Sequence, residues 1–212
     1  MNDVDILRHL IEQYLEICSH PEQPERRRLW RDLHALQSER PMVYARAFAW
    51  REQPENHCEC ADSLFRGIEA SLRKALFRNR FGDDMVFEPW LVLPAVHRVR
   101  GWGVDITRHR TEHQRGSFKV DYPLKSLSEV EKLRVPRHDI DEETTARNME
   151  RLQEAVGDLI PVSLDRRPAY RSFLADISTD LFYLRGMENY MMDMIDDPEG
   201  LHRLVKFMSD GI

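Results

Sequence analysis

Glu88 is a lone carboxylate inside a nearly continuous apolar run from Met85 to Leu93. A carboxylate that is buried without a partner costs on the order of several kcal/mol or is forced into its neutral form. Two explanations for Glu88 remain open. It acts as an acidic catalytic group in a site, or it forms a salt bridge at the end of a strand.

Arginines at separate places in the chain supply the opposite charge. Arg46 is the second candidate catalytic residue. Asp165 ends a predicted strand at 160–165, where parallel sheets in barrels gather their ligand contacts. The candidate substrate-binding residues are Arg51, Trp50, Trp90, Asp165 and Arg185.

The segment His57-Cys58-Glu59-Cys60 holds residue types that zinc accepts. Its three candidate ligands, His57, Cys58 and Cys60, crowd into four residues and lack the second pair that a structural zinc site uses. The segment therefore remains a weak candidate for a metal site, and the alternative is a loop with incidental thiols.

Composition limits the classes of protein. A net charge of -6 and a pI near 5.9 argue against general nucleic-acid binding. No apolar run reaches membrane-spanning length, and the acidic start of the chain does not read as a secretory signal. Three cysteines do not make a disulfide framework, so we expect a cytoplasmic protein without a membrane partner.

The elements that must position these residues alternate between helices and strands. Apolar residues at helical spacing predict helices at 3–18, 25–38, 62–80, 142–157 and from Tyr170 to Leu181. A capping box at Ser126 predicts a short helix up to Leu133. Residues 40–51 are predicted to be a strand that enters a loop, and further strands are predicted at 85–93, 104–106, 117–124 and 160–165. This order favours a parallel sheet with helical crossovers.

Residues 184–204 predict two helices that meet at a sharp corner. Apolar residues recur at helical spacing before the corner, so one side of the first helix is apolar. Asp197 suits the N-cap of the second helix, Pro198 its first position, and Glu199 the positive end of its dipole. From physics alone, this is a structural corner.

The residue pattern of this corner resembles that of the uroporphyrinogen decarboxylase superfamily, which includes corrinoid-linked methyltransferases. The resemblance rests on Arg185-Gly186, the acidic corner and the following Leu-His-x-Leu. Arg40-Pro41 followed by Arg46 is similar to the start of that family's barrel, where two arginines bind carboxylates. The second arginine of the motif falls on Trp50, with Arg51 one place later. Phe87-Glu88-Pro89 stands where the family has Phe-Ser-Asp.

The resemblance implies a (β/α)8 TIM barrel. The chain supplies about three core strands, so we expect the N-terminal portion of such a barrel, with leading helices at 1–38 and barrel residues at 39–212. The alternative is a complete α/β domain with an open sheet edge.

The resemblance also implies the function. We expect a methyltransferase-like enzyme that moves a methyl group between a corrinoid and an acceptor, with zinc and a corrinoid as the implied cofactors. One alternative is a tetrapyrrole decarboxylase, which needs no cofactor and stabilises charge with placed groups such as Arg46, Arg51 and Glu88. A non-catalytic partial barrel is the third reading. The expected partners are a small-molecule or tetrapyrrole substrate, a corrinoid protein and a second copy in a homodimer.

Overall fold

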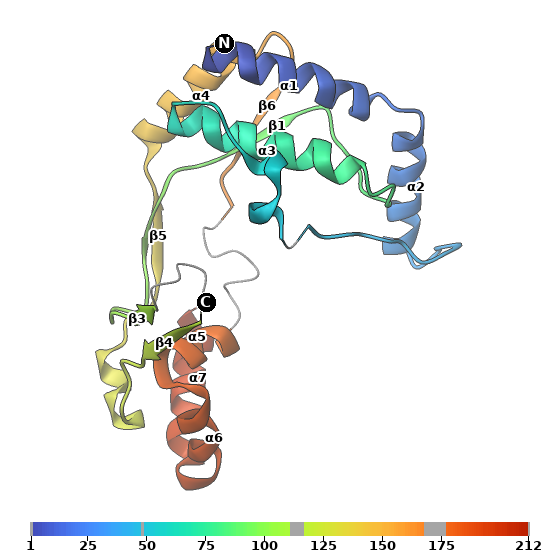
Figure 1. Cartoon of the computed structure of the whole chain (residues 1–212). Coiled ribbons are helices and arrows are strands. Elements are labelled where there is room, and N and C mark those ends of the chain that lie inside the picture. Colours follow the sequence, from blue (N-terminus) through green and yellow to red (C-terminus); the bar gives the residue numbers. More distant parts are fainter. Residues whose placement is uncertain (1, 48, 111–116, 168–176, 212) are drawn as a thin grey trace. The chain divides into compact units, whose positions relative to one another are not determined.

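The computed structural model describes residues 2–47, 49–110, 117–167 and 177–211. Contacts divide the chain into two compact units. Unit 1 comprises Met1–Pro94 and Glu142–Asp165, and unit 2 comprises Ala95–Asp141 and Arg166–Ile212. Figure 1 labels the elements of both, and each unit is described by itself.

Unit 1 is a helical layer over one pair of strands. Its elements are α1 (Asp3–Cys18), α2 (Glu22–His34), the 3-10 turns η1 (Trp50–Glu52) and η2 (Pro54–Asn56), α3 (Ser63–Asn79), β1 (Leu91–Pro94), α4 (Glu142–Val156) and β6 (Val162–Asp165). Strands β1 and β6 run parallel, with Leu91 opposite Val162 and Pro94 opposite Asp165. Helix α1 packs closely against α3.

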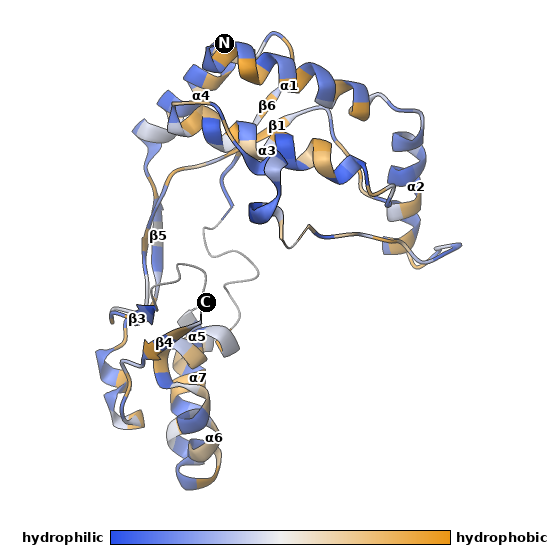
Figure 2. Cartoon of the chain, viewed as in Figure 1, coloured by the Kyte–Doolittle hydropathy of each residue, from blue (hydrophilic) through white to orange (hydrophobic). Residues whose placement is uncertain are grey.

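Side-chain caps start two of the helices of unit 1. Asn2 and Asp5 form a capping box at α1, and the Asp62 side chain accepts from Leu64 N and Phe65 N at α3. Figure 2 shows hydrophobic and hydrophilic residues alternating along α1 and α3, as expected of helices that bury one face. The buried faces form one core; its fully buried members include Leu7, Ile11, Cys60, Leu152 and Ile160.

Unit 2 combines short antiparallel strands with a helical cluster. Its elements are β2 (His97–Arg100), β3 (Thr107–Arg110), β4 (Phe118–Asp121), the 3-10 helix η3 (Leu127–Lys132), β5 (Arg137–Ile140), α5 (Ile177–Arg185), α6 (Met187–Asp196) and α7 (Pro198–Gly211). Strand β2 pairs with β5, and β3 pairs with β4, both antiparallel. Gly186 joins α5 to α6 at φ +83°, and a Cβ there would lie 2.6 Å from the Tyr122 ring, so glycine is required.

The predicted portion of a TIM barrel is wrong. The described residues form a mainly helical α/β structure with six short strands in three two-stranded sheets, and no barrel closes among them. Four of the six strands pair antiparallel. Strands β2 and β3 read His-Arg-Val-Arg and Thr-Arg-His-Arg and are largely exposed, whereas core strands of a barrel are apolar and covered on both faces.

Several local predictions can also be compared with the structure. Residues 40–47 form no strand, and the run at 85–93 becomes a strand only at β1. The predicted parallel pairing holds for β1 and β6 alone among the described strands. Residues 170–176 of the predicted helix lie outside the described residues, and α5 begins at Ile177. Throughout the described ranges, every helix is too short or too polar to cross a membrane.

Candidate functional site

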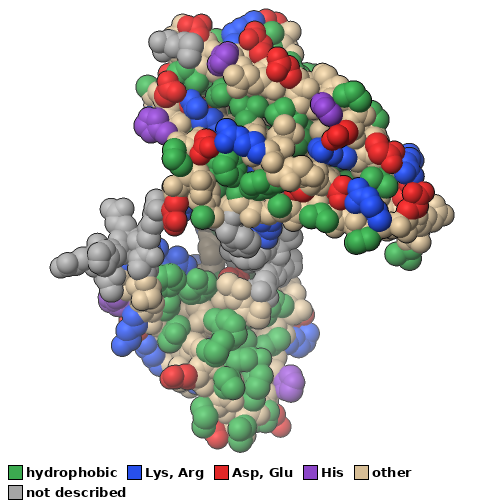
Figure 3. Space-filling model, turned by 45° about the vertical axis from the view of Figure 1, so that its right-hand side comes forward, with side chains coloured by type: hydrophobic (Ala, Val, Ile, Leu, Met, Phe, Trp, Pro, Cys, Tyr) green, Lys and Arg blue, Asp and Glu red, His purple; other side chains and the backbone are tan. Residues whose placement is uncertain are grey.

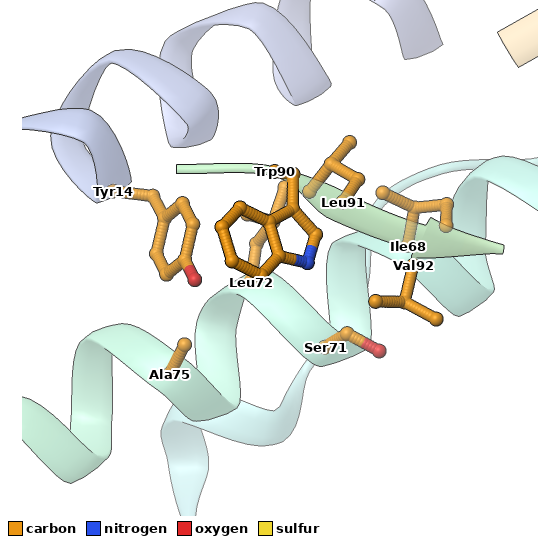
Figure 4. A pocket seen from close by; sticks show the side chains of 8 residues that line it. All are labelled: Tyr14, Ile68, Ser71, Leu72, Ala75, Trp90, Leu91 and Val92. Atoms are coloured by element: carbon orange, nitrogen blue, oxygen red, sulfur yellow. The ribbon is translucent and has the colours of Figure 1, made fainter. Parts of the chain in front are cut away.

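A pocket of about 230 Å³ lies in unit 1, where β1 passes over α3 and the end of α1. Its lining residues are Tyr14, Ile68, Ser71, Leu72, Ala75, Trp90, Leu91 and Val92. In Figure 4, the indole of Trp90 lies over Leu72 and beside the Tyr14 ring. None of the lining side chains carries a charge at neutral pH, so the pocket suits a neutral, mainly apolar group.

Small residues on α3 leave the space for this pocket. Ser71 and Ala75 are spaced four residues apart and therefore share one face of the helix. Their short side chains border the buried Leu72, while longer residues would fill the gap to β1. The Ser71 hydroxyl donates to Gly67 O at 3.0 Å within the helix. The volume therefore comes from side-chain size, not from a break in the fold.

Tyr14 fixes the far wall of the pocket. Its hydroxyl donates to Glu88 O at 2.9 Å, which ties α1 to the segment that enters β1. Burial raises the pKa of Tyr14 well above its ordinary value, so the hydroxyl remains a protonated donor. Its ring meets Phe87 edge to face at 6.3 Å between centroids, a favourable aromatic geometry. The wall is therefore preformed.

The solvent side of the pocket is formed by exposed apolar side chains of β1 and the residue before it. Successive side chains of a strand point to opposite faces of the sheet, so Leu91 and Leu93 are buried while Val92 is exposed. Trp90 and Val92 are 42% and 47% exposed. Large apolar side chains thus remain accessible at the mouth of the pocket.

Volume limits what the pocket holds. An apolar cavity of about 150 Å³ accommodates benzene, and whole drug-sized ligands occupy about 300–1,000 Å³. At about 230 Å³, the pocket fits one ring system, not a complete tetrapyrrole. Trp90 offers a flat face on which such a ring can stack.

A second hollow in unit 1, of about 280 Å³, is more open to solvent. It is lined by Trp30, Tyr44, Met85 and Val86. Trp30 Nε1 donates to Asp84 O at 2.6 Å, so the indole is held edge-on by the backbone. The hollow has no wall comparable to β1, and we regard the Trp90 pocket as the candidate site.

Glu88 forms a salt bridge, which is one of the two explanations that the sequence left open. Arg27 Nε lies 3.1 Å from both carboxylate oxygens, and Arg27 Nη2 lies 2.9 Å from one of them. The hydrogen bonds to Glu88 raise the pKa of Arg27. This contact joins α2 to the residues before β1. Glu88 therefore has a structural role beside the pocket, and its predicted catalytic role remains a prediction.

The other predicted site residues are distributed over both units. Arg46 and Arg51 are exposed in the segment that precedes α3. Trp50 is buried and packs on Phe77 at 5.2 Å between centroids, so it belongs to the core. Asp165 ends β6 opposite Pro94, as expected for the carboxyl end of a parallel pair.

Arg185 belongs to unit 2, where it is buried. Its Nε and Nη2 donate to the Asp193 carboxylate at 2.7 and 2.8 Å, and its Nη1 donates to Leu124 O and Lys125 O. The hydrogen bonds to Asp193 raise the pKa of Arg185. These contacts occupy the guanidinium, so Arg185 is a structural residue within its unit.

The candidate zinc segment does not fit a metal. Cys60 is fully buried, and burial together with its contact to Glu69 raises the pKa of the Cys60 thiol to about 12. Zinc binds the thiolate, which this environment disfavours. His57 is exposed and Cys58 half-buried. Over the described ranges, no three His, Cys, Asp or Glu side chains are placed to hold a metal ion.

Sequence reasoning found Trp90 but missed the rest of this pocket. Tyr14, Ile68 and Leu72 read as ordinary core residues of amphipathic helices. The available signal was the series of small residues at four-residue spacing on α3, namely Gly67, Ser71 and Ala75. Such a series shows that a helix face has room, but not which element faces it.

Comparisons with protein-family models, with curated proteins and with solved structures found no match to this chain.

Proposed function

We propose that the chain binds a small molecule by inserting a neutral planar ring into the Trp90 pocket. The observation that carries this proposal is the preformed, uncharged pocket between α3 and β1, with an exposed indole at its mouth. Trp90 stacks on the ring, and the Tyr14 wall sets its depth. A larger ligand projects past Val92 into solvent.

Titration with indole tests the proposal. Ligand efficiencies of small fragments give an expected Kd on the order of 1 mM. Binding is followed by chemical-shift changes of amides in α3 and β1. Ser71→Leu fills the pocket and is expected to abolish binding, whereas Trp90→Ala removes the stacking surface and weakens it about tenfold.

Lys74→Leu is the matched control, because it adds the same side chain on the exposed side of the same helix. It should bind indole as the wild type does. Shifts confined to the hollow around Trp30, or binding that survives Ser71→Leu, would contradict the proposal.

The function implied by the uroporphyrinogen decarboxylase resemblance is the second candidate. The parallel pair of β1 and β6 favours it, because ligands of parallel sheets sit at the carboxyl ends of strands, and Asp165 stands there beside Pro94. The resemblance implies two reactions, methyl transfer and decarboxylation, and each has its own assay.

Two assays address this candidate. One measures carbon dioxide released from a porphyrinogen carrying carboxylate side chains, and the other measures a methyl group moved from a methylcorrinoid to a thiol. The release of carbon dioxide should fall at least tenfold in Arg46→Ala, because the guanidinium binds the substrate carboxylate. Activity unchanged in Arg46→Ala would remove this residue from the site.

A further inference from the structure

Helix α6 of unit 2 presents its apolar side outward. Large apolar side chains on this helix are between 49% and 78% exposed, whereas its buried residue is an aspartate. The exposed members are Met187, Met191, Met192, Met194 and Ile195, and we call them the α6 face. Figure 3 shows hydrophobic side chains gathered over the part of unit 2 that contains α6. This is the reverse of an ordinary amphipathic surface helix.

A buried ion pair fixes this orientation. Asp193 is the bidentate partner of Arg185, and both side chains are about one-tenth exposed. Asn189, one turn earlier, donates to Arg185 O at 2.9 Å. Rolling α6 to bury its methionines would expose Asp193 to water and leave the Arg185 charge unpaired inside the unit, which is strongly unfavourable. The α6 face is therefore held outward by the fold.

The charges around the α6 face are acidic. Glu188 and Asp196 are exposed on α6 itself, and the corner that follows carries Asp197 and Glu199. The carbonyl end of the α6 dipole points toward this corner and adds to its negative potential. Basic side chains begin only beyond the corner, at His202 and Arg203 on α7. From residue 187 to 201, the chain contains no lysine or arginine.

These charges disfavour a second copy as the occupant. In an antiparallel pair of α6 helices, Glu188 of one copy would face Asp196 of the other, and in a parallel pair each carboxylate would face its equivalent. Neither arrangement offers a basic partner, and like charges in contact destabilise an interface. The five side chains expose on the order of 500 Å² of apolar surface, less than the roughly 800 Å² that each partner of a standard-size complex buries, so this face alone suits a smaller contact than a dimer of whole domains.

Such an area matches a single helix. An amphipathic helix binds through anchors at i, i+3, i+4 and i+7, and Met187, Met191 and Met194 repeat at the complementary spacing. Methionine side chains are unbranched and polarizable, so a methionine surface adapts to anchors of different shape. Lysines and arginines beside the anchors would meet Glu188 and Asp196.

We propose that the α6 face is a docking site for a basic amphipathic helix of another protein. Its methionines receive the apolar anchors of that helix, and its acidic border pairs with the basic residues. The charge pattern selects the partner class, and the apolar contact supplies most of the affinity. The proposal is independent of the Trp90 pocket in unit 1.

Synthetic peptides and the full 212-residue chain test this inference. The probe is an 18-residue helix with leucines on one face and lysines elsewhere; one control replaces each lysine by glutamate, and another scrambles the leucine pattern. Fluorescence anisotropy at about 50 mM salt, where charges interact beyond about 10 Å, should show the lysine peptide binding at least tenfold more tightly than either control.

Variants locate the site. Met191→Gln with Met194→Gln should weaken lysine-peptide binding at least tenfold, whereas Val99→Gln with Val135→Gln, a matched pair of exposed apolar residues elsewhere in unit 2, should leave it unchanged. Glu188→Lys with Asp196→Lys should reverse the preference toward the glutamate peptide. Since all six positions are exposed, the variants should retain the wild-type circular dichroism.

Three results would overturn the inference. The first is equal binding of all three peptides, and the second is lysine-peptide binding that survives the double glutamine variant. The third is evidence for another occupant, together with equal affinity for the peptides. That evidence would be dimerisation in sedimentation experiments, or binding to phosphatidylcholine vesicles, if the double glutamine variant abolishes it.

Discussion

The two units of this chain orient the apolar faces of their amphipathic helices in opposite ways. In unit 1, α1 and α3 bury their apolar faces against each other, with Leu7 and Leu72 almost fully enclosed. In unit 2, α6 buries Asp193 and exposes its methionines. The difference lies in Arg185: a buried guanidinium needs a carboxylate, and in unit 2 Asp193 of α6 supplies it.

Unit 1 also contains a buried carboxylate, but it is used differently. Glu69 on α3 accepts from Glu59 N and Cys60 N and pairs with Arg73, all within one loop and one helix. This local network leaves the apolar side of α3 free to face the core. Glu69 is buried together with Phe65, Ile68 and Leu72 of the same helix, so its hydrogen bonds do not turn the apolar side of α3 outward.

The largest effect is expected from Asp193→Ala, which tests the ion pair of unit 2. Removing the carboxylate leaves Arg185 charged and buried, which should lower the free energy of unfolding of unit 2 by about 3–5 kcal/mol. Hydrogen exchange of amides in α5 to α7 measures this loss, and amides of α1 and α3 provide the internal reference.

The double variant Arg185→Met with Asp193→Ala is the control, because it removes both buried charges. Replacing both partners by uncharged groups should recover a large part of the stability, since no buried charge remains unpaired. Equal loss in the single and the double variant would show that the ion pair is not what holds α6 in its orientation.

The next prediction compares the stability lost by truncating one core side chain with that lost by truncating one exposed side chain. Leu7→Ala in unit 1 should cost about 3 kcal/mol, because it removes a fully buried side chain and leaves a cavity. Met191→Ala in unit 2 should change stability by less than about 0.5 kcal/mol, because its side chain is already exposed. Urea unfolding of both variants gives the two values; a cost above about 2 kcal/mol for Met191→Ala would mean that the α6 face is buried.

The smallest effect is an acid response of unit 1. The hydrogen bonds from Arg40 hold the pKa of Asp84 at about 2, below its ordinary value near 4. A carboxyl group whose pKa is lower in the folded than in the unfolded state stabilises the fold above pH 4. This stabilisation is lost as the pH falls from about 4 to about 2. Because Arg40 is half exposed, we expect roughly 1 kcal/mol. Urea unfolding between pH 5 and pH 2 should show this loss in the wild type.

Asp84→Asn is the matched variant for this response. It keeps the shape of the side chain and removes its titration, so its stability should fall less than that of the wild type over the same pH range. A wild-type loss that persists unchanged in Asp84→Asn would assign the acid response to other carboxylates.

The sequence was sufficient for most local features. The capping box at Ser126 is present, as is the corner at Asp197, whose side chain accepts from Gly200 N at 2.9 Å. These features depend on residues within a few positions of one another, so spacing alone reveals them. The strand at 160–165 was found for a similar reason, since four adjacent residues suffice to form β6.

Features that join distant segments were the ones the sequence missed. The barrel was wrong because alternation of helices and strands does not specify which strands pair, and β2 to β5 pair antiparallel. Glu88 was ambiguous until Arg27, 61 residues away, appeared as its partner. The pocket beside Trp90 needed α3 and β1 to be placed together.

By itself, the sequence determined which segments form helices and which side of each is apolar, because these properties come from neighbouring residues and a fixed helical period. Tertiary structure alone decided which side faces inward. In α6 it turned the apolar side to the solvent, because Arg185 on another helix holds Asp193 inside. A contact between elements such as this ion pair has no signature in the apolar spacing of one helix.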